Sequence, residues 1–214
     1  MMKMKNKNGL KNVIWLAMLC LIGVSCSTTK NLPEGEILYT GIDRMEVVNE
    51  DKTLAGITAL TEVEAALAYA PNNAIFGSSS MRWPVPFGLW VYNGFEKYQN
   101  KKGVGRWIFD HLGTSPVLMS SVNGETRAKV ATNLLRDYGY FNGSVKYEEV
   151  PQKNPKEAKV NYIIDMAQPY FLDSIAYLKY PVYADSLIRT TRQQSVLKSG
   201  DNFSVIKLDE ERQR

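Results

Sequence analysis

The stretch Asn123–Val150, NGETRAKVATNLLRDYGYFNGSVKYEEV, changes from helical to strand periodicity within a few residues. In its first half, apolar residues recur at the spacing of one helix face, namely Val130, Ala131, Leu134, Leu135 and Tyr138. Asn123 suits the N-cap position, and Gly139 suits the left-handed residue that follows a helix. The sequence therefore predicts a helix that ends at Gly139.

Two strands are predicted directly after this helix. Polar and apolar side chains alternate along Ser144, Val145, Lys146, Tyr147 and Glu148, which would turn Lys146 and Glu148 to water. Further on, one face of a second strand collects Val160, Tyr162, Ile164 and Met166. The connection 151–157 contains two prolines and suits a loop that is longer than a tight hairpin turn.

Upstream, the sequence predicts one more strand and one more helix. Residues 36–48, EILYTGIDRMEVV, are rich in β-formers, although Gly41 interrupts them. A short helix follows, since a capping-box pattern begins at Thr61 and Pro71 cannot continue a helix. The order β-α-α-β-β predicts an α+β domain over residues 37–167, with two helices on one face of the sheet.

A connection of unusual length, residues 72–119, joins the two predicted helices. It carries three of the four tryptophans, Trp83, Trp90 and Trp107. One interpretation is a surface that contacts a membrane or a partner, because Trp favours half-wetted interfaces. The other is a satellite core, in which FGLWVYNGF and RWIFDHL form short helices that pack on the domain.

The first residues have the pattern of a secretory signal. Four lysines and no acidic residue precede an apolar run, Val13–Val24, that is too short to span a bilayer. The end of this run, Gly23-Val24-Ser25-Cys26, resembles a bacterial lipobox, in which the cysteine is lipidated; an ordinary signal-peptidase site is the alternative. We expect residues 1–25 to be removed, Cys26 to carry the lipid, and residues 26–36 to form a polar tether.

Charge argues against one class of function. The sequence has 26 Lys and Arg against 22 Asp and Glu, and its isoelectric point is about 8.9. Four of the basic residues lie in residues 1–25, so the remaining chain is balanced at 22 of each sign. A balanced chain gives no support to nucleic-acid binding or to a polybasic membrane surface.

After residue 167 the order of elements begins again. Residues 168–180 read as a strand, residues 184–197 as a helix, and residues 205–214 as the start of a second helix. Two strands of this second unit, residues 168–214, are missing, and half a domain cannot bury a normal core. The pattern predicts that the chain is a fragment or the product of an interrupted reading frame.

Together these motifs resemble the polypeptide-transport-associated (POTRA) domains of the BamA/TamA superfamily of outer-membrane assembly proteins. The resemblance is carried by the β-α-α-β-β order, by Gly139-Tyr140-Phe141 after the second helix, and by the stretch LDEERQR at 208–214. The stretches Cys26–Gly41 and Pro86–Met119 are similar to lipid-anchored TamA-like proteins of Bacteroidota. The similarity concerns the N-terminal POTRA region of such proteins, with one complete and one partial domain.

This resemblance implies a lipid-anchored scaffold in the outer membrane, facing the periplasm, that assists the assembly or insertion of outer-membrane proteins. Its partners would be outer-membrane lipid through Cys26 and unfolded outer-membrane protein clients or assembly subunits, with no nucleic acid and no cofactor. The second strand of a POTRA domain lies at the sheet edge, so Ser144, Val145, Lys146, Tyr147 and Glu148 form the candidate client-binding strand. An alternative is that the charges on this strand prevent pairing.

The sequence predicts a binding protein and not an enzyme. His111 is the only histidine, and its neighbours Asp110 and Ser115 are close to it only along the chain, so we expect His111 to be structural. One histidine and one retained cysteine give no metal site. The main alternative is a small envelope lipoprotein that binds a cell-wall component through the aromatic insertion at 72–119, and a hydrolase would need His111 for turnover.

Overall fold

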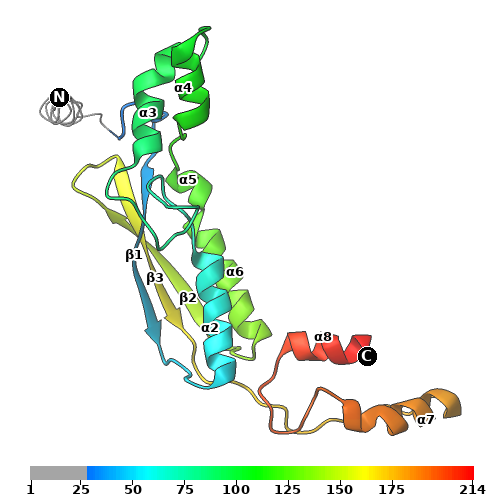
Figure 1. The fold of residues 1–214 in the computed structure, drawn as a ribbon. Coiled ribbons are helices and arrows are strands. Elements are labelled where there is room, and N and C mark those ends of the chain that lie inside the picture. Colours follow the sequence, from blue (N-terminus) through cyan, green and yellow to red (C-terminus); the bar gives the residue numbers. More distant parts are fainter. Residues whose placement is uncertain (1–27) are drawn as a thin grey trace, which may run out of the picture.

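The computed structural model describes residues 28–214, and Figure 1 shows how their elements are arranged. The expected mixed α+β class is confirmed for this range. The predicted signal peptide and the candidate lipidation site Cys26 lie outside the described residues. Between residues 28 and 214, every helix is too short or too polar to cross a bilayer.

The sheet has three strands, β1 (Leu38–Val48), β2 (Ser144–Pro151) and β3 (Glu157–Asp165). Their order is β1-β3-β2, with β3 parallel to β1 and antiparallel to β2. The face of β3 that was expected to be apolar is buried, with Val160, Tyr162, Ile164 and the following Met166 almost fully enclosed. The central strand therefore supplies the floor of the core.

Two helices cover that face, α2 (Leu54–Leu67) and α6 (Gly124–Asp137), and they lie side by side in Figure 1. A single turn, α5 (Met119–Val122), leads into α6. The buried side chains of the two long helices are Ala59, Val63, Leu67, Ala128, Ala131 and Leu135. Small residues at several of these positions allow the helices to pack closely on the sheet.

The helix pair is held together at one end by Arg127 of α6. Its guanidinium donates to the carbonyl oxygens of Ala66 at 3.0 Å and Ala68 at 3.3 Å, at the C-terminal end of α2, and to Val122 at 2.9 Å. It also lies over the ring of Tyr69, 4.6 Å from the centroid. One cation thus satisfies carbonyls that the end of a helix leaves unpaired.

The predicted start of the first helix was wrong. The helix begins at Leu54, because the Thr53 hydroxyl caps it by accepting the Gly56 N–H at 3.1 Å, whereas Thr61 lies inside the helix and donates to the Ile57 carbonyl. The N-cap Asn123 of α6 and the positive φ of Gly139 are confirmed. Val130 is 49% exposed, however, so the buried face of α6 is rotated away from it.

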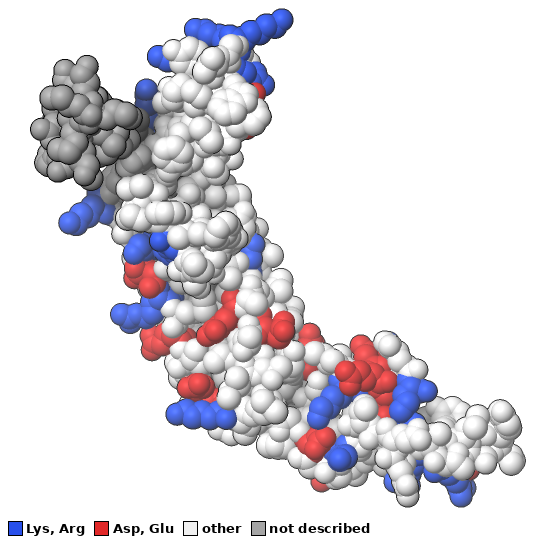
Figure 2. All heavy atoms as spheres, viewed as in Figure 1, with Lys and Arg blue, Asp and Glu red and all other residues white. Residues whose placement is uncertain are grey.

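Residues 72–119 contain α3 (Phe87–Phe95), the short η1 (Glu96–Tyr98) and α4 (Val104–Leu112). The two α-helices pack on each other, with the rings of Tyr92 and Phe109 5.2 Å apart, and project beyond the end of the sheet in Figure 1. We call this unit the hairpin. Figure 2 shows basic side chains at its far end and a largely uncharged surface between that end and the sheet.

Residues 28–31, which belong to the predicted tether 26–36, bond to the folded domain. The Thr28 hydroxyl donates to the Glu157 carboxylate, and the Thr28 carbonyl accepts from the Asn93 amide at 3.1 Å. The Asn31 amide donates to the Asn93 carbonyl at 3.3 Å. Polar side chains that indicated a solvated linker in the sequence instead bond to α3 and to the start of β3.

The C-terminal segment contains α7 (Val182–Thr191), η2 (Arg192–Gln194) and α8 (Val205–Gln213). The two helices agree with the sequence prediction, but the strand expected at 168–180 was wrong. Only Phe171 pairs there, in an isolated bridge with Asn202. Residues 170–172 bond through their backbones to residues 200–203, but this pairing is too short to form a strand.

The Gly139-Tyr140-Phe141 motif ties this segment to the first domain. The Tyr170 N–H donates to the Gly139 carbonyl at 2.9 Å, and the ring of Phe141 contacts the rings of Tyr170 and Phe203 at 5.2 and 5.0 Å. Gly139 has φ +91°, and a Cβ there would lie 2.6 Å from the Phe203 carbonyl oxygen. We call this contact the junction.

Tyr140 itself points the other way, into the core. Its side chain is fully buried, and its hydroxyl donates to the Asp51 carboxylate at 2.6 Å. Burial raises the pKa of Asp51, but the hydrogen bonds from Tyr140 and Thr53 outweigh it and leave that pKa below its ordinary value. The motif therefore joins the end of α6 to the start of α2.

Replacing Tyr140 by Phe should lower the free energy of unfolding by about 1 kcal/mol at pH 7, because the Asp51 carboxylate loses a charge-assisted donor. A carboxyl group with a lowered folded-state pKa contributes stability above its unfolded pKa and loses it as pH falls through the folded one. The difference between the two proteins should therefore shrink below about pH 4. Urea unfolding between pH 3 and pH 7 measures it.

Tyr138→Phe is the matched control, since it removes a hydroxyl from the same helix end without touching Asp51. It should leave the pH dependence of unfolding as it is in the wild type. A Tyr140→Phe protein whose deficit stays constant from pH 7 to pH 3 would contradict the proposed role of the Asp51 carboxylate.

Candidate functional site

A sheet of three strands has two edges, and in this chain the β1 edge is partly covered. The register of β1 against β3 is interrupted on both sides of Ile42, and Gly41 has φ +114°. At this irregularity the Arg82 guanidinium donates to the carbonyl oxygens of Thr40 at 3.4 Å and Ile42 at 3.3 Å. A side chain on Gly41 would collide with Arg82, so a bulge and a long-range cation protect this edge together.

The β2 edge is the open one. Gln152 donates to the Glu157 carbonyl at 2.9 Å, so the even-numbered residues of β2 bond to β3 and the odd-numbered ones turn their backbone groups outward. The first outward N–H, that of Val145, is taken by the Thr132 hydroxyl of α6 at 3.0 Å. The next two, on Tyr147 and Glu149, face a side on which the described residues place no strand.

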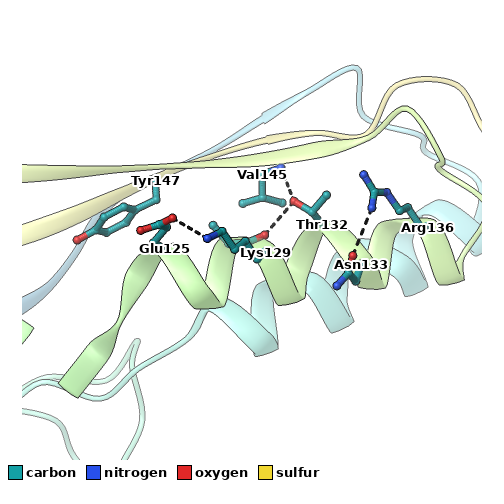
Figure 3. A pocket seen from close by; sticks show the side chains of 8 residues that line it. Glu125, Lys129, Thr132, Asn133, Arg136, Val145 and Tyr147 are labelled. Carbon is teal, nitrogen blue, oxygen red and sulfur yellow. Dashed lines mark hydrogen bonds and ion pairs between the residues drawn. The ribbon is translucent and has the colours of Figure 1, made fainter. Parts of the chain in front are cut away.

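A groove of about 490 Å³ runs beside this edge, between β2 and α6 (Figure 3). Its lining residues are Glu125, Ala128, Lys129, Thr132, Asn133, Arg136, Val145 and Tyr147. Glu125 and Lys129 form an ion pair at 2.7 Å, and Arg136 donates to the Asn133 side chain at 3.4 Å. The groove thus has an apolar strip along β2 and polar side chains along α6.

A second hollow of about 460 Å³ continues the groove past Tyr147, and both are lined by Glu125 and Tyr147. The Tyr147 hydroxyl donates to Glu149 at 2.5 Å, and burial together with this bond raises the pKa of Tyr147. A Cβ on Gly124 would lie 2.1 Å from the Tyr147 ring, so the absence of a side chain there lets the ring lie against α6. The uncharged Tyr147 side chain therefore lies between the two hollows, positioned by its bond to Glu149 and its contact with α6.

The structure places all of the candidate strand, Ser144 to Glu148, on β2, and β2 at the sheet edge as the resemblance implied. Lys146 and Glu148 are exposed, as predicted. Sequence reasoning missed two contributors, Glu149 with its outward N–H and Thr132 with its bond to Val145. Both contributions depend on contacts in three dimensions and leave no pattern in the sequence. A threonine within a helix usually bonds to the carbonyl four residues back, and Thr132 does that as well.

The other candidate surface, the three tryptophans of residues 72–119, does not form one cluster. Trp83 and Trp107 are 60% and 55% exposed, whereas Trp90 is half-buried in α3. Among the described residues nothing accepts a hydrogen bond from the buried Trp90 Nε1. Trp90 is thus a packing residue, and Trp83 and Trp107 are the surface ones.

Two of the residues that a hydrolase would need, His111 and Asp110, bond to other groups. His111 Nδ1 donates to the Trp107 carbonyl at 2.9 Å and the imidazole stacks on the Trp107 ring, while Asp110 pairs with Arg106. Within residues 28–214, no group of three or more His, Cys, Asp or Glu side chains is placed to hold a metal ion.

Comparison with known proteins adds little to this geometry. No family model and no curated protein matches the chain. A crystal structure of Haemophilus influenzae BamA POTRA3-5 has 10% sequence identity and a TM-score of 0.28, over 84% of this chain and 85% of that one. A TM-score this low establishes neither fold nor function, so the interpretation depends on the strand order, the open edge and the groove.

Replacing Thr132 by Val, which has the same shape, should expose the role of the hydroxyl at the edge. The Val145 N–H would lose its acceptor, and we expect a loss of about 1 kcal/mol in unfolding free energy and faster hydrogen exchange at Val145. Thr132→Ser keeps the hydroxyl and should preserve the protection of that amide. Equal exchange rates at Val145 in the wild type and in Thr132→Val would show that the bond does not close this part of the edge.

Proposed function

We propose that the chain is a lipid-anchored, periplasm-facing scaffold of the BamA/TamA kind, which holds an extended segment of an unfolded outer-membrane protein at the edge of β2. The observation that carries the proposal is the pair of outward backbone N–H groups on Tyr147 and Glu149 beside the groove under α6. An extended client gains main-chain hydrogen bonds at such an edge, and its alternate side chains gain a groove.

The chemistry of the groove suits this class of client. Strands of outer-membrane proteins alternate apolar and polar side chains, so one face of an added strand would present apolar groups to Val145, Tyr147 and Ala128. Charged termini or polar side chains would meet Glu125, Lys129 and Arg136 along α6. Because main-chain bonds dominate, binding would tolerate many client sequences.

Two further observations support a POTRA-like origin for this site. The order of β1, α2, α6, β2 and β3 follows the β-α-α-β-β pattern, with α3 to α5 placed between the long helices. The Gly139-Tyr140-Phe141 motif lies where α6 ends, and its aromatic side chains serve the core and the junction.

The proposed location depends on the lipid at Cys26 and on export through residues 1–25. The residues after Cys26, Ser27-Thr28-Thr29-Lys30, lack the acidic cluster that resembles a surface-export signal in Bacteroidota lipoproteins, which favours the periplasmic side. The role is one of binding, without catalysis and without a cofactor.

The structure changes where the decisive substitution should be made. From the sequence alone, proline would be placed at Ser144 or Lys146, but these even-numbered residues bond to β3, and proline there would weaken the sheet itself. Glu149 lies on the outward side, where proline removes a donor that only a client would use.

We therefore expect Glu149→Pro to lower crosslinking of an unfolded outer-membrane protein by about tenfold, since one hydrogen bond and close approach of the client backbone are lost. Glu149→Ala is the control, because it removes the same carboxylate but keeps the N–H, and it should capture the client as the wild type does. The assay compares photo-crosslinked yield at equal protein concentration.

Thermal unfolding of both variants should match the wild type within a few degrees, which shows that β2 is intact. Undiminished capture by a folded Glu149→Pro protein would overturn edge pairing as the mode of binding. Equal losses in the Pro and Ala variants would point to the carboxylate and likewise contradict the proposal.

A further inference from the structure

The hairpin and the residues just before it expose several large apolar side chains to solvent. Trp107 of α4 stacks on His111 at 4.9 Å between ring centroids, and His111 lines a hollow of about 620 Å³ under the base of the hairpin. Large apolar side chains that line this hollow are Trp83, Val85, Phe87 and Leu112. We call these four residues, together with His111 and the Trp107 that stacks on it, the aromatic face.

The aromatic face is exposed to a degree that a satellite core does not explain. Phe87 is 58% exposed, close to the values of Trp83 and Trp107, and no residue of α4 is buried. On α3, in contrast, Leu89 is fully enclosed. The satellite-core interpretation therefore describes the inner side of α3, whereas α4 and the aromatic face have a large apolar area left in water.

Positive charge is in excess around this surface. Residues 65–118 contain five basic and two acidic residues, although the chain after residue 25 is balanced. One of the two acids, Asp110, is paired with Arg106. The lysines Lys97, Lys101 and Lys102 lie at the far end of the hairpin, where Figure 2 shows the basic side chains. The region thus combines exposed Trp with an unbalanced positive charge.

The hairpin also lies where the chain would enter a membrane. Asn93 of α3 donates to the Thr28 carbonyl at 3.1 Å and accepts from Asn31 at 3.3 Å, so residue 28 is fastened to the hairpin. Cys26 is two residues earlier, which the chain spans in at most about 7 Å. A lipid on Cys26 would enter the bilayer close to α3.

We propose that the aromatic face and the lysines of the hairpin dock on the surface of a phospholipid bilayer that contains anionic headgroups. Trp prefers the interfacial layer, and lysines attract anionic lipids while their stems lie along apolar surface. Because α4 has nine residues and a length of about 14 Å, it lies along the surface and does not cross it. The lipid on Cys26 belongs to the proposed function, but every residue of the docking surface belongs to the described chain.

The test uses residues 28–214, so neither the apolar run nor a lipid can contribute. The protein is mixed with vesicles of phosphatidylethanolamine and phosphatidylglycerol, or with vesicles of phosphatidylcholine alone, and binding is measured by flotation. Tryptophan emission is recorded alongside. We expect binding to the anionic vesicles that weakens with added salt, with a blue shift of the emission.

Two variants separate the contributions. Lys101→Glu/Lys102→Glu should weaken binding to the anionic vesicles by roughly 30-fold, since each lysine contributes on the order of 1 kcal/mol near such a surface. Trp107→Ala should weaken it by about tenfold and reduce the blue shift. Tyr183→Ala on α7 is the matched control, because Tyr183 is an exposed aromatic residue distant from the hairpin, and it should bind as the wild type does.

Absence of binding to both kinds of vesicle would overturn the proposal, as would equal binding to both or equal losses in Tyr183→Ala and Trp107→Ala. Retention on purified peptidoglycan without vesicle binding would assign the surface to the cell wall instead. The outcome is independent of the β2 edge, since Glu149→Pro should bind vesicles normally. The lysine double variant and Trp107→Ala should in turn capture an unfolded client normally in solution. Circular dichroism confirms that each variant is folded.

Discussion

A sheet of three strands contains only one strand that is paired on both sides, and the rest of this structure follows from how the two remaining edges are treated. Strand β3 takes the centre and carries the most completely buried face. The edge of β1 is bent by a bulge and covered by Arg82, so it offers little to another chain. The edge of β2 is closed only at Val145, by Thr132 of α6, and beyond that residue its backbone faces a groove. The asymmetry between the edges, more than any single side chain, leaves β2 as the edge at which another extended chain could pair.

Polar contacts between residues distant in the sequence add to the apolar packing that positions the helices. Arg127 joins the end of α2 to the start of α6, and Tyr140 bonds to Asp51 just before α2 begins. These side chains satisfy carbonyls and a carboxylate that would otherwise be costly to bury. They hold α2 and α6 over the sheet, and α6 forms one side of the groove at β2. The apolar core supplies most of the driving force, while these few bonds decide one arrangement among similar packings.

The periodicity of residues 123–166 was sufficient to predict α6, β2 and β3, because strong amphipathic patterns there agree with clear caps. Periodicity did not predict the start of α2, because the local signals there conflict. The helix begins at Leu54, which is 82% exposed, and Gly56 in its first turn interrupts the apolar pattern that follows the cap at Thr53. Periodicity also failed at 168–180, where the backbone pairing is too short to form a strand. The resemblance implied that β2 has an open side. Only the register of β2 with β3 shows which of its residues turn their N–H groups outward, and hence that Glu149 is important. Arg82 and Thr132 could not be found from sequence, since their partners are distant along the chain.

The junction also determines how the molecule would respond to mechanical load. The chain leaves β3 at Asp165, and by Tyr170 it is already bonded to the carbonyl of Gly139 at the end of α6. Phe141 packs against Tyr170 and Phe203 at the same point. Tension applied to the segment that carries α7 and α8 is therefore shared between a helix end and a strand end. Until the junction opens, such a pull reaches the end of α6 as well as the end of β3, so it does not act on the last hydrogen bonds of β3 alone.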